Sequence, residues 1–399
     1  MQEFMDHVLT SFLSTTRWNV DNSYASLTTT ANNLLDFQLP HGLRLHVASL
    51  AAANFATSYT LGTKGVVDGS ASFLYTSLGL RGFESRSKDV PLNRVVRGYR
   101  QLRQLHTLPQ QTTNEQDGSE KWARKDTLVY GRLYLPSNTL EAMYLRRLSP
   151  NRLLRLHSVS DSTLPSGGSI LAQLQNDYGK YSTEYLYSTD SSLLGFRALY
   201  NFGYDPRMPI DEQHVTHVPP RHPWDHQNGR LSAGAEAYFS PINKSGGMST
   251  GLRFTTLPVH TGFPYTMTLT LNPLMGNLSS TYAVKAGSNL ALCSRFDFNF
   301  YSYESDTCLG LELYQRAAPQ PPSAETSWAR ALFRSGWEKP PVEDDVSSVL
   351  KARMSDKGKV GLVWEGRIKE LLVSLGAGLD LKKRDRVVST VGLEIRYSS

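Results

Sequence analysis

A period of two in hydrophobicity runs through most of the chain after Pro40. Residues 265–271 read YTMTLTL, so Met267, Leu269 and Leu271 alternate with three threonines. Because the side chains of a β-strand point to opposite faces in turn, this segment has one apolar face and one polar face. The pattern predicts strands, and so many strands in succession indicate a β-sandwich or a β-barrel.

Segments of this kind are about 8–12 residues long and are separated by turn residues such as Gly, Pro and Asp. They lie at 43–50, 54–62, 66–75, 127–135, 139–148, 151–159, 168–177, 180–188, 192–201, 230–239, 247–257, 265–271, 276–285, 289–301, 305–315, 357–365, 371–381 and 386–397. They amount to roughly 18 strands, and a weaker segment at 92–100 would bring the number to about 19. Strands that cross a bilayer need about 9–11 residues, so the lengths are suitable.

The beginning of the chain follows a different period. Its apolar residues, among them Phe4, Val8 and Phe12, recur at helical spacing. We therefore expect residues 1–38 to form an amphipathic helical segment in or at the lumen of a single barrel made by residues 39–399. Long loops are expected near 102–125, 202–229 and 316–356, the last with a short helix near 346–354.

Two features favour a membrane barrel over a soluble β-sandwich, whether enzyme or adhesin. The polar faces of the strands carry charges, for example Arg295, Asp297, Glu312 and Glu394, and a wide barrel can hold water or a plug against such a face. Tyrosine is abundant, with 20 residues, and many aromatic residues lie near strand ends, where membrane barrels place them. The mean hydropathy of −0.36 suits a wall in which only every second residue faces lipid.

Other membrane and charge patterns are weaker. The sequence contains no run of about 18 apolar residues, so it predicts no spanning helix. The net charge of +6 could indicate a nucleic-acid partner. Because the basic residues are scattered along the chain, we expect no nucleic acid and favour contact with membrane lipids.

No residue pattern indicates catalysis. The spacings GxSxG, HExxH and the P-loop are absent, so we expect no enzyme activity and no catalytic residues. The two cysteines, Cys293 and Cys308, form no CxxC pair, which predicts free thiols, no metal and no cofactor. A histidine cluster could in principle bind a metal, but prolines interrupt it, and we interpret it as an exposed loop. The cluster consists of His214, His217, His222 and His226.

The last predicted strand ends in a short motif. Residues 390–397 read TVGLEIRY, which fits the pattern polar-x-Gly-x-x-apolar-x-apolar of a β-signal in mitochondrial outer-membrane barrels. Thr390, Gly392, Ile395 and Tyr397 occupy the four defining positions. The odd-numbered residues of the motif would face lipid, while Gly392 on the other face would allow close approach of a backbone.

Longer blocks of unusual sequence occur from one end of the chain to the other. They are EFMDHV, RWNVDNSYASL and LLDF near the start, then DGSASFLY, VYGRLYLPSNTLEAMYLRRLSP, LTLNPLMGNLSSTYAVKAG, SRFDFNFYSYESD and LVWEGRIKELLVSLGAG. These blocks resemble the mitochondrial distribution and morphology protein 10 family of fungal outer-membrane barrels. The three predicted loops resemble nothing fixed in that family.

The resemblance implies an all-β, porin-like transmembrane barrel of about 19 strands in the mitochondrial outer membrane, with the first and last strands paired in parallel. It implies two sets of partners. One is the ER–mitochondria encounter structure, a tether that supports lipid exchange and mitochondrial morphology. The other is the sorting and assembly machinery, with its core barrel and cytosolic subunits, where the family promotes late assembly of the general import translocase.

The resemblance also suggests where these partners bind. It places the sorting-machinery interface at Phe296 and Phe298 and the tether interface at Phe73 and Tyr75. Simple contact with lipid would place the same residue types on the same faces. A passive metabolite pore is the alternative function, and it differs from the first in an open lumen and in the lack of stable partners.

Overall fold

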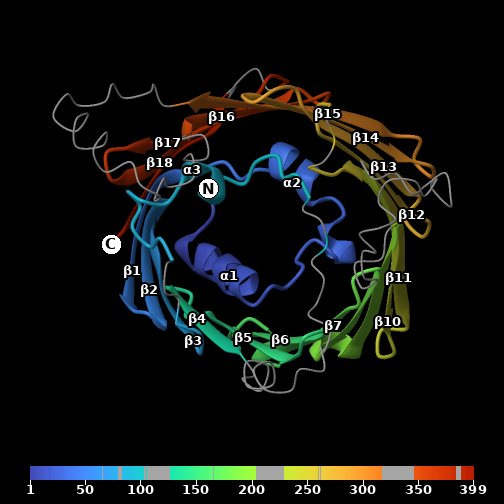
Figure 1. Ribbon diagram of the computed structural model, residues 1–399, viewed down its shortest axis with the longest axis horizontal. Helices are drawn as coiled ribbons and strands as arrows, with labels where there is room; N and C mark the ends of the chain where they lie inside the picture. The colour runs from blue at the N-terminus through green and yellow to red at the C-terminus, as the bar shows by residue number, and fades with distance from the viewer. Residues whose placement is uncertain are drawn as a thin grey trace, which may run out of the picture.

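The chain forms one closed sheet of strands. The computed structural model describes residues 1–64, 66–79, 83–102, 105, 126–164, 166–203, 229–258, 260, 262–316, 346–382 and 388–399. In these residues 19 strands form a single sheet, which appears as a ring in Figure 1. The strands are β1 Gly42–Ala52, β2 Phe55–Lys64, β3 Val66–Thr76, β4 Thr127–Leu135, β5 Leu140–Ser149, β6 Arg152–Ser160, β7 Gly168–Asp177, β8 Tyr181–Ser188, β9 Leu193–Phe202, β10 Gly229–Ser240, β11 Ser245–Thr256, β12 Tyr265–Asn272, β13 Asn277–Lys285, β14 Leu290–Asn299, β15 Ser305–Arg316, β16 Val346–Ser355, β17 Lys359–Ile368, β18 Leu371–Asp380 and β19 Val388–Ser398.

The first and last strands close the barrel. Each strand pairs antiparallel with its neighbours in sequence, whereas β1 and β19 pair in parallel, from Gly42 opposite Gly392 to Ala48 opposite Ser398. In such a meander all odd-numbered strands run in one direction. Because the last strand also has an odd number, closure has to join two parallel strands. The all-β barrel of about 19 strands that the sequence predicts is thus confirmed.

The identity of one strand differs from the prediction. Residues 92–100 form no strand, since Leu92–Val95 is a short helix, α3. The helix expected near 346–354 is instead strand β16. Val349 of β16 faces inward against the α3 segment, while Leu350 faces outward. With apolar residues on both faces the alternation is hidden, and the spacing of Val346, Val349 and Leu350 imitates a helical stripe.

All three long connections leave the same end of the barrel. They follow β3, β9 and β15, which are odd-numbered and therefore end at one rim. We call this rim the loop end and the opposite one, where even-numbered strands end, the turn end. The predicted loops at 102–125, 202–229 and 316–356 fall largely outside the described residues, but β16 takes up residues 346–355 of the third.

The lumen contains helices and irregular chain. The helices α1 (Phe4–Thr15) and α2 (Thr29–Leu35) lie inside the ring, together with α3 (Figure 1). The apolar face of α1, including Val8 and Phe12, packs on inward residues of β2–β6 such as Leu128 and Leu145. Likewise α2 packs on β13 and β14, and the α3 segment packs on β16 and β18. Burial of these apolar faces is the main favourable term that holds the segments inside.

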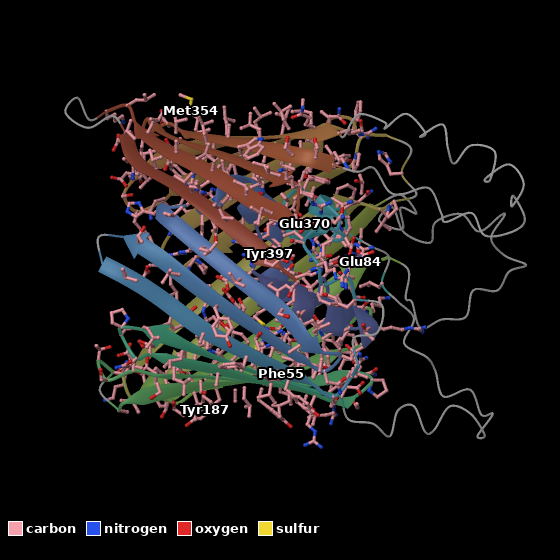
Figure 2. All side chains as sticks on the ribbon, turned by 90° about the vertical axis from the view of Figure 1, so that its left-hand side faces the viewer. Phe55, Glu84, Tyr187, Met354, Glu370 and Tyr397 are labelled. Atoms are coloured by element: carbon pink, nitrogen blue, oxygen red, sulfur yellow. The ribbon has the colours of Figure 1, made fainter. Side chains whose placement is uncertain are left out.

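The outer wall is apolar. In β12, Met267 and Leu269 are exposed, whereas Thr266 and Thr268 between them are buried on the inner side. Large apolar side chains project from the tilted strands all along the wall in Figure 2, where Phe55 and Tyr397 lie on the side toward the viewer. This is the arrangement of a barrel surrounded by lipid. Among the helices of the described residues, none is long and apolar enough to cross a membrane.

Candidate functional site

Phe73 and Tyr75 belong to an aromatic cluster on the outside of the barrel. Their side chains are 46% and 50% exposed. On the neighbouring strand, Phe55 stacks on Phe73 with ring centroids 6.2 Å apart, and Tyr59 meets Phe73 edge to face at 6.3 Å. We call Phe55, Tyr59, Phe73 and Tyr75 the β2–β3 aromatic patch. Because β3 ends and β2 begins near the loop end, the patch lies in that half of the wall.

The sequence prediction missed two members of this patch. Phe55 and Tyr59 are four residues apart in the predicted strand 54–62 and therefore share a face. That spacing was available as a signal, but only the register of β2 and β3 sets Phe55 opposite Tyr75. Cross-strand aromatic pairs of this kind stabilise a sheet and present a rigid surface.

Phe296 and Phe298 lie on β14, at the other end of the barrel. Phe296 is 46% exposed, while Phe298 is half-buried because its ring meets Phe300 edge to face at 5.2 Å. Since β14 is even-numbered, Phe298 and Phe300 are at the turn end. We call Phe296, Phe298 and Phe300 the β14 aromatic patch.

An ordered apolar rim continues the β14 aromatic patch. Two hydrogen bonds join the β12–β13 and β14–β15 turns. The Tyr301 hydroxyl donates to the Pro273 carbonyl at 2.9 Å, and the Phe300 amide donates to the Gly276 carbonyl at 2.8 Å. The tips of the two turns expose large apolar side chains. These are Leu274, Met275, Tyr301 and Tyr303. Exposed apolar side chains that are gathered and fixed in this way typically mark an interaction surface.

The two patches are far apart on the wall. Seven strands, β2, β1 and β19 to β15, separate β3 from β14 in one direction, and ten strands, β4 to β13, separate them in the other. Figure 1 places β3 and β14 on nearly opposite sides of the ring. One patch lies in the loop-end half and the other at the turn end, so a single compact partner cannot contact both.

The residues of the predicted β-signal divide between the two faces of β19. Ile395 and Tyr397 point outward with Val391, and Tyr397 is visible on the wall in Figure 2. Thr390 and Gly392 point inward. A side-chain carbon on Gly392 would overlap the carbonyl group of Pro40 and the amide nitrogen of His41. The close backbone approach expected at this glycine is therefore present in the folded barrel.

The charged inner faces pair within the lumen. Arg295 donates to both oxygens of Asp36, at 2.7 and 3.1 Å, at the end of α2. The buried Glu312 lies 3.6 Å from the Lys351 ammonium, which is also 3.5 Å from Glu365. The Met1 amino group contacts Glu365 in turn. The Lys351 ammonium thus lies between two buried carboxyl groups of neighbouring strands.

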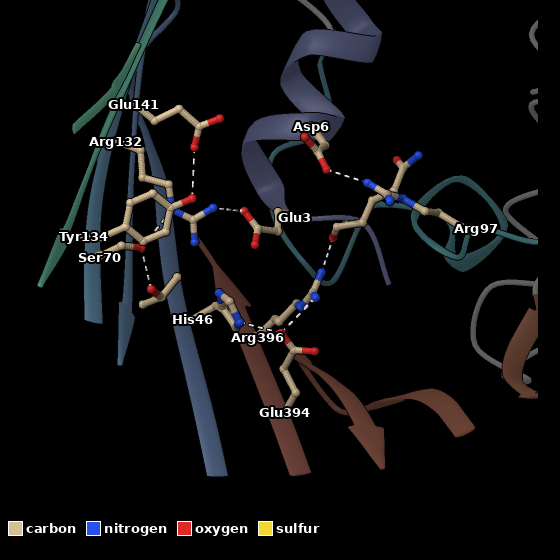
Figure 3. A network of polar contacts seen from close by, with 12 residues as sticks. Glu3, Asp6, His46, Ser70, Arg97, Arg132, Tyr134, Glu141, Glu394 and Arg396 are labelled. Carbon is tan, nitrogen blue, oxygen red and sulfur yellow. Dashed lines mark hydrogen bonds and ion pairs between the residues drawn. The ribbon is translucent and has the colours of Figure 1, made fainter. Parts of the chain in front are cut away.

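A second network joins α1 to the wall (Figure 3). Arg132 of β4 donates to Glu3 at 2.7 Å, and Arg97, which follows α3, donates to Asp6 at 2.6 Å. Burial raises the pKa of Asp6 from its ordinary value, although the Arg97 guanidinium acts to lower it. On the seam of the barrel, the Glu394 carboxylate contacts both His46 and Arg396.

The described part of the lumen contains a cavity beside α1. This cavity of about 670 Å³ lies between α1, residues 32–41 and the wall, and paired side chains such as Arg132, Glu365 and Glu394 line it. The described residues contain no group of three His, Cys, Asp or Glu side chains placed to hold a metal ion. His214, His217, His222 and His226 lie outside the described residues, and Cys293 and Cys308 are free thiols.

Comparison with known proteins identifies the family. The model of the family described as mitochondrial distribution and morphology protein 10 matches residues 1–334 and 321–399. Proteins of that name from Phaeosphaeria nodorum and Sclerotinia sclerotiorum are 58% and 54% identical to this chain, and each alignment covers 100% of both proteins. The protein of that name from Podospora anserina is 42% identical over the same full coverage. The chain belongs to the mitochondrial distribution and morphology protein 10 family.

Proposed function

We propose that this protein is a non-enzymatic barrel of the mitochondrial outer membrane that acts through partner proteins. It would tether mitochondria to the ER within the ER–mitochondria encounter structure and thereby support lipid exchange and mitochondrial morphology. It would also associate with the sorting and assembly machinery and promote late assembly of β-barrels and of the general import translocase. The family name supports a role in mitochondrial distribution and morphology, and the resemblance supports the two sets of partners.

The filled lumen is the observation that carries this proposal. The helices α1 and α2 and the α3 segment occupy the barrel interior through apolar contacts and ion pairs. A passive metabolite channel, the alternative function, needs an aqueous passage through the lumen. Here a cavity of about 670 Å³ beside α1 is lined in part by charged side chains that pair with each other, such as Arg132 with Glu3. The outer wall, by contrast, carries the β2–β3 and β14 aromatic patches among its exposed side chains.

Each aromatic patch is assigned to one set of partners. The β2–β3 aromatic patch would bind the tether through Phe73 and Tyr75. The β14 aromatic patch, with its apolar rim, would bind the sorting machinery through Phe296 and Phe298. Binding energy at protein interfaces concentrates in a few large aromatic anchors. Their positions on opposite sides of the barrel allow each interface to be lost without the other.

Purification from outer membranes in mild detergent tests this assignment. Phe73→Ala with Tyr75→Ala should lose the tether subunits and keep the sorting machinery, while Phe296→Ala with Phe298→Ala should do the opposite. A matched control is Tyr185→Ala with Phe196→Ala, an outward aromatic pair on β8 and β9 with centroids 5.4 Å apart. If the control loses both partners, or if neither patch variant loses any, the patches only contact lipid and the assignment is wrong.

A further inference from the structure

The seam between β1 and β19 is the one parallel pairing in the described sheet. Seven residue pairs join the two strands, from Gly42–Gly392 to Ala48–Ser398. Parallel pairing is slightly less stable per residue than antiparallel pairing. No turn links these strands, so no short connection fixes their register, as it does in a hairpin. Some other feature of the chain has to set it.

Three inward glycines form a saddle beside this seam. They are Gly376 and Gly378 of β18 and Gly392 of β19. A side-chain carbon on Gly376 would lie 2.5 Å from Pro40 Cδ. One on Gly378 would first meet the hydroxyl groups of Thr390 and Ser389 on β19, and it would also lie 3.0 Å from Leu39 Cδ1. On Gly392 it would overlap the Pro40 carbonyl group and the His41 amide. None of the three has a positive φ, so close approach of the chain, and not backbone conformation, requires glycine here.

The segment on the saddle leads directly into the seam. Residues 39–41 lie on the glycines, and the next residue, Gly42, forms the first seam pair, with Gly392. The position of Pro40 and His41 on Gly392 therefore determines which residue of β1 stands opposite Gly392. A shift by one residue would turn every side chain of β1 to the wrong face, and a shift by two would keep the faces but misalign the pairs.

Lumen residues contact β19 at two further levels. Arg396 donates to the Gln2 carbonyl, and its seam partner His46 contacts Glu394 (Figure 3). Nearer the loop end, the Ser398 hydroxyl donates to the Ser85 carbonyl at 2.6 Å, and the Ser87 amide donates to the Ser398 carbonyl at 3.1 Å. The inner side of the closing strand is thus covered from Gly392 to Ser398 by chain that fills the lumen.

We infer that the glycine saddle is the docking site of residues 39–41 and that this docking sets the register in which the barrel closes. Gly392 then has a role in the folded barrel that is separate from recognition of the β-signal, and Gly376 and Gly378 share that role although they lie outside the motif. Filling of the lumen and closure of the wall become one coupled step, because the segment that fills the lumen also aligns the first strand.

Seam cross-linking of the full chain, refolded into detergent micelles without any assembly machinery, tests the inference. Leu45→Cys and Ile395→Cys occupy paired outward positions, and Cys293 and Cys308 are replaced by Ala and Ser. In this background Gly376→Ala should reduce the in-register cross-link about fivefold or more, the effect expected from forcing a methyl group into a close contact. The matched control is Gly131→Ala, because nothing lies within 4 Å of a side-chain carbon built there.

A second variant separates loss of register from general misfolding. Pro40→Ala removes the Cδ atom that the new methyl group of Gly376→Ala would meet, so the double variant should recover most of the cross-link. Far-UV circular dichroism monitors strand content in each sample. The inference is overturned if Gly376→Ala cross-links like the parent protein, or if Pro40→Ala fails to restore a cross-link that Gly376→Ala has lost.

Discussion

Lys351 contacts two buried carboxylates in the lumen. Its ammonium group lies between Glu312 and Glu365, at 3.6 and 3.5 Å, and all three side chains are almost completely buried. The carboxylate of Glu312 also accepts the Tyr99 amide at 2.9 Å. One lysine of the wall thus lies between buried acids on both neighbouring strands, and Glu312 also joins this cluster to the β3–β4 connection inside the lumen.

Replacement of Lys351 tests how much this arrangement contributes to the free energy of unfolding. Lys351→Met leaves Glu312 and Glu365 with less positive charge nearby, and removal of one partner from buried ion pairs typically costs about 3–5 kcal/mol. We expect the free energy of unfolding to fall by this amount in denaturant titrations in detergent micelles. Lys357→Met is the control, because Lys357 is 62% exposed and pairs with Asp306 at 3.2 Å. Its effect should stay below about 1 kcal/mol, and an equal loss in both variants would contradict the argument.

At the scale of elements, α1 joins two kinds of contact. Its buried face, with Val8 and Phe12, packs on β2–β6, while Glu3 and Asp6 near its start pair with Arg132 and Arg97. Arg97 belongs to the β3–β4 connection, so α1 lies between the wall and a second lumen segment. Release of α1 would therefore widen the lumen on both sides of the helix.

Phe12→Ala tests whether α1 keeps the lumen closed. Removal of a fully buried phenylalanine costs about 3–5 kcal/mol, most of it at the contact between α1 and the wall. In planar bilayers we expect the parent protein to pass little current, and Phe12→Ala to open more often and to become sensitive to proteases near residues 1–15. Ser14→Ala, on the exposed side of the helix, should behave like the parent. Large, steady conductance of the parent protein would instead support the pore function.

At the scale of the whole molecule, the two aromatic patches are independent surfaces. They are separated by six strands, β1 and β19 to β15, along the shorter path around the wall and lie toward opposite ends of it. Effects of substitutions at distant sites that share no contacts add within a few tenths of a kcal/mol. Exchange of the protein between its proposed partner complexes would then depend on the supply of partners and not on competition for one surface.

This independence predicts the behaviour of a combined variant. A protein with Phe73→Ala and Phe296→Ala should lose each set of partners to the same extent as the corresponding single variant, as measured by quantitative co-purification. Cells that lack only one set of partners should show no compensating change in binding at the other patch. A change in sorting-machinery binding caused by Phe73→Ala alone would show that the surfaces are coupled.

The sequence by itself determined the architecture and the facing of side chains. Alternation in segments such as 265–271 is a local property, because a strand turns every second side chain to the same side whatever its neighbours are. The same reasoning set Phe73, Tyr75 and Phe296 on the outer face and Arg295 and Glu312 on the inner one, as the structure shows. The assignment of the patches to partners came from family resemblance and remains a prediction.

Tertiary structure decided what lies inside the barrel and how it closes. The sequence pattern predicts a helix where strand β16 forms, because Val349 on the inner face of this strand is apolar. Val349 is apolar there because it packs on the α3 segment, which is far away in the chain. The salt bridge of Arg295 with Asp36 and the contact of Gly392 with Pro40 join residues more than 200 positions apart. The period of hydrophobicity along the sequence cannot predict such contacts, since they arise only when the closed wall brings distant strands around the same lumen.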